Sequence, residues 1–142
     1  MTRKLIAVLA TLVLCVVSTP AAAQDVKVIV NSANSVSDLS GDVVTKLFLK
    51  QSAKFPNGTA AQPVDQGKSS SARAAFSKSV LGRAVGAVES YWQQQIFSGK
   101  DVPPPTKASD DEVVAYVKAN AGAIGYVSAG ASTAGVKVVD VK

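Results

Sequence analysis

The chain has 142 residues, 47% of them hydrophobic, with 15 Lys and Arg against 10 Asp and Glu and no His. Its single Cys lies in an N-terminal segment that we expect to be removed, so disulfides, thiolate or imidazole catalysis, and His or Cys metal sites are excluded from the remainder. The weak positive charge is scattered, which argues against a nucleic-acid partner and is compatible with a small anion.

The first residues have the pattern of a signal peptide. Arg3 and Lys4 precede an uncharged apolar stretch at residues 5–17, and small residues then lead to Ala23. A membrane anchor is the weaker alternative, because a spanning helix needs about 20 apolar residues. A lipoprotein is a second alternative, but Cys15 follows a Leu, whereas lipidation favours a small residue there.

Cleavage after Ala23 would leave residues 24–142, which is enough chain for one small domain with a modest core. The sequence therefore predicts a periplasmic or secreted protein with two parts. These are a signal peptide at residues 1–23 and a single α/β domain at residues 24–142.

The domain begins with a predicted strand and a predicted helix. Residues 26–30 are rich in β-branched Val and Ile, which favours a strand. Ser40 is a suitable helix cap and Asp42 a favourable first-turn residue for the helix that follows. Its apolar residues recur at helical spacing: Val43, Val44, Leu47 and Phe48.

The middle of the chain alternates turns with short elements. Residues 55–59 contain an Asn-Gly pair that indicates a turn, and residues 60–64 favour a short strand. We expect residues 65–71 to form a polar, flexible loop. Residues 72–81 then return to a helical pattern, giving a strand, loop and helix in succession.

A further helix is predicted at residues 87–97, where it carries Tyr91 and Trp92. Aromatic side chains on a helix can stack on a ligand, but packing into the core is their more common role. We therefore interpret both residues as core residues. The proline run at residues 103–105 prevents this helix from continuing.

The last predicted helix has the clearest start in the sequence. Ser109 and Glu112 have the spacing of a capping box, and the acidic residues between them suit the first turn of a helix. The same acidic cluster might suggest cation binding, but capping is the stronger interpretation. Strands are expected at residues 123–127 and 136–139.

One loop contains the candidate ligand-binding residues Lys68, Ser69, Ser70 and Ser71. Hydroxyls, backbone N–H groups and an ammonium close to a helix N-terminus would stabilise an anion. Serine-rich loops also commonly do no more than cap helices, and composition alone favours that interpretation. A nucleotide phosphate loop fits poorly, because the upstream glycine of that pattern is absent.

The order of several short segments resembles the substrate-binding proteins of phosphate ABC transporters. The most specific is Gly-Ala-Ile-Gly-Tyr-Val at residues 122–127. Together the segments span most of the chain after residue 28. The others are found at residues 34–40, 47–50, 55–58, 91–92 and 97–99.

The resemblance implies an α/β fold, a single periplasmic-binding-protein-like lobe in which a mixed sheet is flanked by helices. Members of the family close two lobes on their ligand, and this chain resembles the second lobe. A single lobe would leave half of the anion's oxygens to water and should bind it weakly.

The sequence departs from the family at the phosphate loop. The family pattern Arg-x-Asp-Gly-Ser-Gly-Thr corresponds to residues 66–72, where only Ser70 falls on a matching hydroxyl. The arginine and aspartate of the pattern are absent, although Asp65 and Arg73 lie close to the loop in the sequence. The resemblance therefore supports the fold more strongly than the ligand.

The sequence analysis favours a periplasmic solute-binding protein that holds phosphate or a similar small oxyanion and works with an ABC transporter. The alternative is an interaction module that has lost its ligand and docks on another envelope protein or on a second copy of itself. An enzyme ranks third, because without His or Cys its mechanism would need Ser and Lys close together. We assign no catalytic residue, metal site or cofactor.

Overall fold

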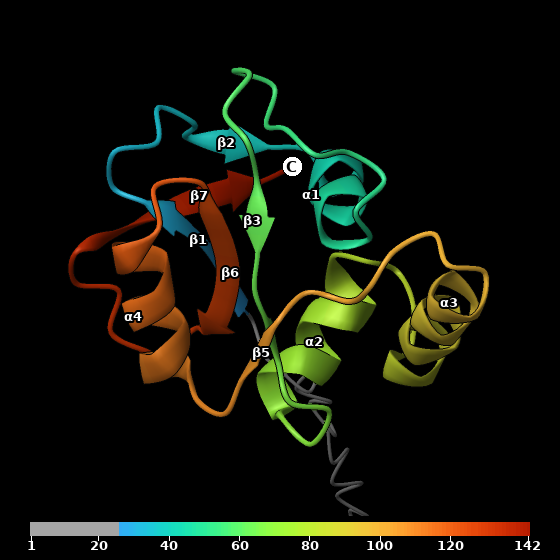
Figure 1. Ribbon diagram of the computed structural model, residues 1–142. Coiled ribbons are helices and arrows are strands. Elements are labelled where there is room, and N and C mark those ends of the chain that lie inside the picture. The colour runs from blue at the N-terminus through green and yellow to red at the C-terminus, as the bar shows by residue number, and fades with distance from the viewer. Residues whose placement is uncertain (1–25) are drawn as a thin grey trace, which may run out of the picture.

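The computed structural model describes residues 26–142, so the predicted signal peptide at residues 1–23 lies outside the described residues. Within the described range, no helix combines the length and the apolar character needed to cross a membrane. A mixed sheet lies between α4 on one side and α1, α2 and α3 on the other (Figure 1).

Five strands form the main sheet in the order β2-β7-β1-β6-β3. The central strand β1 is antiparallel to both of its neighbours, with Val28 opposite Tyr126 in β6 and Val139 in β7. The edge strands β2 and β3 run parallel to β7 and β6. The bounds are β1 Val26–Asn31, β2 Asp38–Leu39, β3 Gln62–Pro63, β6 Ala123–Ser128 and β7 Val136–Val141.

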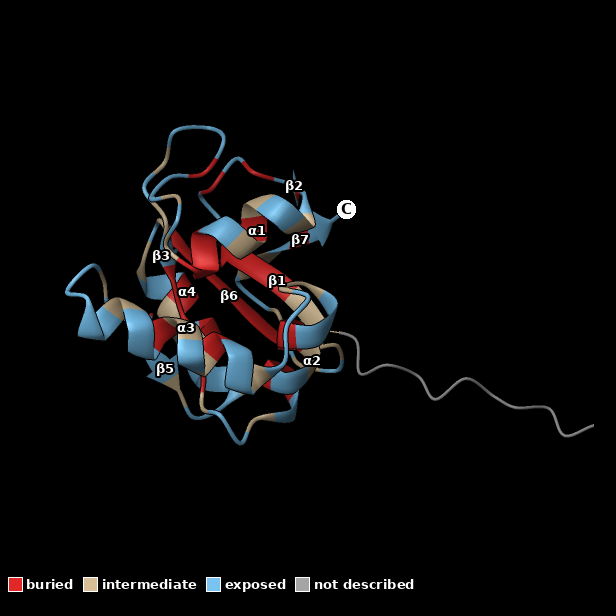
Figure 2. Cartoon of the chain, turned by 90° about the vertical axis from the view of Figure 1, so that its right-hand side faces the viewer, coloured by how far each residue is buried: buried red, intermediate tan, exposed pale blue. Residues whose placement is uncertain are grey.

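Alternation along β1 divides the core between the two faces of the sheet. Val28 and Val30 join the larger hydrophobic cluster under α1 and α2, whereas Ile29 joins the cluster under α4. Strand β6 is buried on both faces (Figure 2), which explains its nearly continuous apolar sequence. The predicted strands at residues 26–30, 123–127 and 136–139 are all present.

The two capped helices begin where the sequence predicts. Ser40 accepts a hydrogen bond from the Val43 N–H at the start of α1, Gly41–Phe48. Ser109 does the same for the Glu112 N–H at the start of α4, Asp110–Ala119. The Glu112 carboxylate in turn accepts a hydrogen bond from the Ala108 N–H. In a standard capping box this second bond comes from the N–H of the N-cap residue, and here it comes from the residue before it.

Helix α2, Ser71–Ser79, packs into the larger cluster through Ala72 and Phe76, and α3, Val85–Phe97, lies outside it. Helix α3 begins two residues before the predicted start at residue 87. It packs through Val88 and Trp92 against Leu49, and the Tyr91 hydroxyl donates to the Leu49 carbonyl. Trp92 is thus a core residue, as predicted, and Tyr91 is half-buried.

Two predictions for the middle of the chain need correction. The strand predicted at residues 60–64 is reduced to β3, where Pro63 has no N–H to extend the ladder. Residues 65–71 are not a flexible loop throughout. Asp65–Gln66 form β4, which pairs in parallel with β5, Thr106–Lys107, as a separate two-stranded sheet.

Candidate functional site

The candidate loop is a tight turn between β4 and α2. The Ser70 N–H donates to the Gly67 carbonyl at 2.9 Å, which closes the turn. Ser70 has extended backbone angles and is the N-cap of α2, so its hydroxyl accepts from the Arg73 N–H at 3.3 Å. The capping interpretation of this serine is therefore correct, whatever else the loop does.

The turn forms one wall of a cavity that we call the serine cavity. It lies between the N-terminal ends of α2 and α4 and has a volume of about 530 Å³. Five of its lining residues are serines from three separate segments: Ser69, Ser70, Ser71, Ser109 and Ser128. The fold thus brings three of the four predicted binding residues together and adds two more hydroxyls.

The N-terminus of α2 offers unused hydrogen-bond donors to this cavity. Within residues 26–142, the N–H groups of Ser71 and Ala72 have no protein acceptor. The first turn of α2 contains no acidic residue, so the helix itself supplies no carboxylate to offset the positive end of its dipole. Partial positive charge and free donors at one place favour a bound anion.

The Ser70 hydroxyl already donates a hydrogen bond to the Gln66 side chain. Ser70 donates to the Gln66 side-chain oxygen at 2.7 Å, and the Gln66 amide group donates to the Asp110 carboxylate and the Tyr126 carbonyl at 2.9 Å each. Gln66 is buried, and its side chain links α2, α4 and β6. An anion would receive a hydrogen bond from Ser70 only if that hydroxyl released Gln66.

Asp110 is the one charged side chain that lines the serine cavity among the described residues. Its Oδ1 accepts from Gln66 and, at 3.2 Å, from the Ser128 N–H, whereas its Oδ2 has no hydrogen-bond partner within residues 26–142. Sequence reasoning assigned this residue to helix capping and missed its place in the cavity. No local signal marks it, because it meets the loop only in the folded chain.

Lys68 is separated from the predicted serines. It is exposed and lines a different cavity, on the α3 side of the turn. Neighbouring positions in the sequence had suggested that Lys68 and the serines form one site. In the fold, the turn places Ser69, Ser70 and Ser71 on the serine cavity and Lys68 beside the other one.

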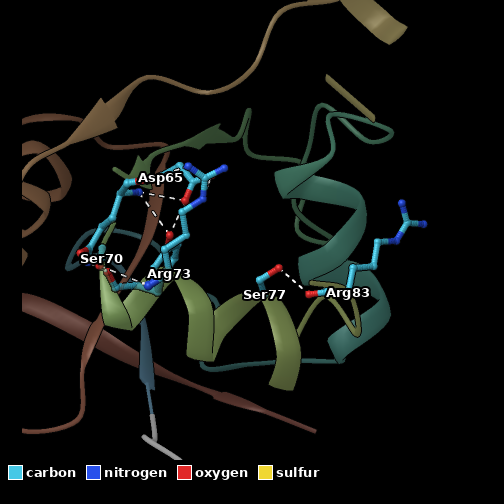
Figure 3. Close-up of polar contacts among 7 residues, drawn as sticks. Asp65, Ser70, Arg73, Ser77 and Arg83 are labelled. Atoms are coloured by element: carbon cyan, nitrogen blue, oxygen red, sulfur yellow. Dashed lines mark hydrogen bonds and ion pairs between the residues drawn. The ribbon is translucent and has the colours of Figure 1, made fainter. Parts of the chain in front are cut away.

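Asp65, which is half-buried, and Arg73, which is buried, lie side by side beneath the turn (Figure 3), and Tyr126 of β6 contacts Asp65. The Tyr126 hydroxyl donates to Asp65, and the Arg73 Nε lies 3.8 Å from the other carboxylate oxygen of Asp65. Burial raises the pKa of the Tyr126 phenol far above its usual value, and the nearby Asp65 carboxylate raises it further. Neither Asp65 nor Arg73 lines the serine cavity.

Solved structures of phosphate-transport proteins share this fold. The ABC-type phosphate transport receptor from Vibrio cholerae aligns with a TM-score of 0.63 and 19% identity, over 82% of this chain and 45% of its own. A structure with bound phosphate from Clostridium perfringens, described as a phosphate ABC transporter substrate-binding protein, gives 0.62 and 18%, over 82% and 44%. PstS from Borrelia burgdorferi gives 0.62 and 10%, over 82% and 47%.

No protein-family model matches the sequence, and no curated protein matches it. The chain spans less than half the length of the solved structures that it matches. The resemblance inferred from short segments is thus confirmed as a likeness of fold to one part of phosphate ABC transporter substrate-binding proteins. The identities are low, so the likeness concerns the fold, a mixed sheet flanked by helices.

Proposed function

We propose that this protein is an extracytoplasmic solute-binding lobe that holds phosphate or a similar oxyanion in the serine cavity. One observation carries the proposal. The N-terminus of α2 has no acidic residue in its first turn, and it opens with three serines onto a cavity of about 530 Å³. The fold is that of proteins described as phosphate receptors of ABC transporters, so a transporter is the proposed partner.

The ligand would be held by hydroxyls and backbone groups without any covalent step. Ser69 and Ser71 have no side-chain hydrogen bond within the described range, so their hydroxyls are available to an anion. Lys68 lies on another cavity, which disfavours a serine and lysine pair for catalysis. The protein is therefore proposed to bind its ligand and release it unchanged.

Asp110 gives the proposed site a preference among anions. Its unpaired Oδ2 can accept a hydrogen bond from an oxyanion that keeps a proton, and it repels one that has none. Phosphate keeps a proton near neutral pH and sulfate does not. We therefore expect phosphate to bind more tightly than sulfate, although both fit the positive end of a helix dipole.

Thermal unfolding of residues 24–142 in phosphate, sulfate and chloride at matched ionic strength tests the proposal. A ligand at 100 times its dissociation constant adds about 2.7 kcal/mol to the free energy of unfolding. Ser71→Asp would place a carboxylate at the start of α2, where it suits the helix dipole but repels an anion. We expect a phosphate-specific stabilisation that this variant loses and that Ser90→Ala, on the exposed surface of α3, retains.

A second candidate, an envelope interaction module without a ligand, is favoured by two observations. The Ser70 hydroxyl is already bonded to Gln66, and the cavity contains the negative charge of Asp110. Identical unfolding curves in all three salts would contradict the anion-binding proposal and favour this alternative. Sedimentation of residues 24–142 would then show whether the partner is a second copy of the chain.

A further inference from the structure

A second cavity lies on the α3 side of the candidate turn, and we call it the tryptophan cavity. Its volume is about 300 Å³, which is at the lower end of the range for small-molecule sites. Trp92 and Ile96 of α3 form its apolar wall together with Pro103 and Pro104. Ile96 is 53% exposed there, so its side chain is accessible to a ligand.

Arg73 provides a buried cation at this cavity. It is only 9% exposed, its Nη1 donates to the Gln66 carbonyl at 3.3 Å, and its Nε faces Asp65 at 3.8 Å. The remaining nitrogen, Nη2, has no hydrogen-bond partner within residues 26–142, and it is not sealed from solvent. Arg73 is one of the residues that line the cavity, so its guanidinium is the buried cation nearest to a ligand bound there.

The charges around the cavity limit what it can bind. Lys68 and Arg73 are positive, and Asp65 and Glu89 are negative, so the lining is neutral in sum. Asp65 directs one oxygen to Tyr126 and the other to Arg73, which leaves the guanidinium of Arg73 and the ammonium of Lys68 as the cationic donors. A neutral lining attracts a small, multiply charged anion only weakly, so apolar contact must supply part of the affinity.

We infer that the tryptophan cavity binds a small aromatic carboxylate, with its ring against Trp92 and Ile96 and its carboxylate on Arg73 and Lys68. Guanidinium and carboxylate form a charge-assisted pair, and the flat ring matches the apolar wall. This site differs from the serine cavity in its lining and in its class of ligand. The inference does not depend on the proposed binding of phosphate.

The chain contains a single Trp, so the NMR signal of the Trp92 indole N–H reports on this cavity without interference. We expect benzoate to shift this signal saturably, with a dissociation constant on the order of 1 mM, as suits a ligand of its size. Benzyl alcohol, which has the ring but no charge, should bind about tenfold more weakly or worse. Inorganic phosphate should not shift the signal.

A matched pair of variants on one helical turn tests the location. Ile96→Glu adds a negative charge to the cavity wall, whereas Phe97→Glu adds it to a residue that is 96% exposed and does not line the cavity. We expect the first to weaken benzoate binding about tenfold or more and the second to leave it unchanged. Lys68→Gln should also weaken binding, without touching the buried core.

Either of two results would overturn the inference. One is the absence of a saturable shift of the Trp92 signal at benzoate concentrations well above 1 mM, on the order of 50 mM. The other is equal affinity of the unmodified protein, Ile96→Glu and Lys68→Gln. Ser71→Asp, which tests the serine cavity, should leave benzoate binding intact, so failure of one proposal is distinguishable from failure of the other.

Discussion

Gln66 is the residue on which the candidate site depends most. It is almost fully buried, and its amide group donates to Asp110 and to the Tyr126 carbonyl while its oxygen accepts from Ser70. A side chain that both donates and accepts is needed at this position. Glutamine meets that need without adding a charge to the interior.

Gln66→Glu should therefore destabilise the fold by about 2 kcal/mol or more. The glutamate would face the Asp110 carboxylate without a donor, and it would bring a second negative charge into the buried network. Gln62→Glu is the matched control, because Gln62 is exposed on β3 and its substitution should change stability by no more than about 0.5 kcal/mol. Urea unfolding of both variants measures the difference, and equal stabilities would contradict the role given to Gln66.

Ionisation of Tyr126 makes the free energy of unfolding depend on pH in the alkaline range. Its pKa in the folded protein is raised above the ordinary value of 10.0, so above that pH the unfolded chain loses a proton that the folded chain keeps. The contribution of this phenol to stability is complete below about pH 10 and declines as the pH rises, by about 1.4 kcal/mol per pH unit.

Tyr126→Phe removes this part of the pH dependence. The loss of stability between about pH 9 and about pH 11 should be about 1.4 kcal/mol smaller in the variant, as measured by urea unfolding at both values. The variant also loses the hydrogen bond to Asp65, so the comparison is between the two pH values within each protein. An unchanged loss in the variant would show that Tyr126 ionises equally in both states.

At the scale of elements, close packing between β6 and α4 depends on a glycine. A Cβ built at Gly125 would lie 2.7 Å from a methyl group of Val113 and 2.8 Å from one of Val64, closer than real contacts allow. Both neighbours are fully buried side chains. The helix approaches the sheet because this position has no side chain.

Gly125→Ala should therefore destabilise the protein by about 1 to 3 kcal/mol through overpacking. Gly86→Ala is the control, because Gly86 lies in α3 with open space around it, and alanine there should be neutral or stabilising by up to about 1 kcal/mol. Chemical denaturation of both variants tests the claim. Equal stability of the two would mean that α4 moves away from the sheet without cost.

Elements with local signals were predictable from the sequence, and those with distant partners were not. The caps at Ser40 and Ser109 are set by residues three positions apart, so helices α1 and α4 begin where expected. Strand β4 was missed because its partner β5 lies about forty residues later and both are only two residues long. Its polar sequence resembles a loop.

The same distinction holds for the candidate site. Ser69, Ser70 and Ser71 were found because a serine run before a helix is a local pattern. Asp110 was missed because it reaches the cavity from another helix, and Lys68 was grouped with the serines because a sequence does not show which side of a turn a residue occupies. Local chemistry is readable from sequence, whereas the sharing of a cavity is a property of the fold.

At the scale of the whole molecule, stability should be uneven. Helix α3 has 13 residues, but only Val88 and Trp92 are buried, together with Leu49, in a small cluster apart from the two main ones. Strands β1 and β6 and helix α4 share the larger clusters on both faces of the sheet. Figure 1 places α3 at the edge of the molecule, and Figure 2 shows that most of this helix is exposed.

Native-state hydrogen exchange should therefore show lower protection in α3 than in β1 and β6, through local opening. Trp92→Ala should lower protection further in α3 while it leaves the order of protection in the sheet unchanged. Equal protection in α3 and β1 would mean that the molecule opens only as one unit, which would contradict this division.

The position of β1 in the sheet has a consequence for biosynthesis. The first strand of the described residues, β1, pairs only with β6 and β7, which are the last two strands. The partners of Val28 are therefore about a hundred residues later in the sequence. A growing polypeptide cannot assemble this sheet until β6 and β7 have been translated, and contacts of such long range slow folding. The nascent protein therefore lacks its central strand pairs until late in synthesis, and the folded domain should form only after β6 and β7 have emerged.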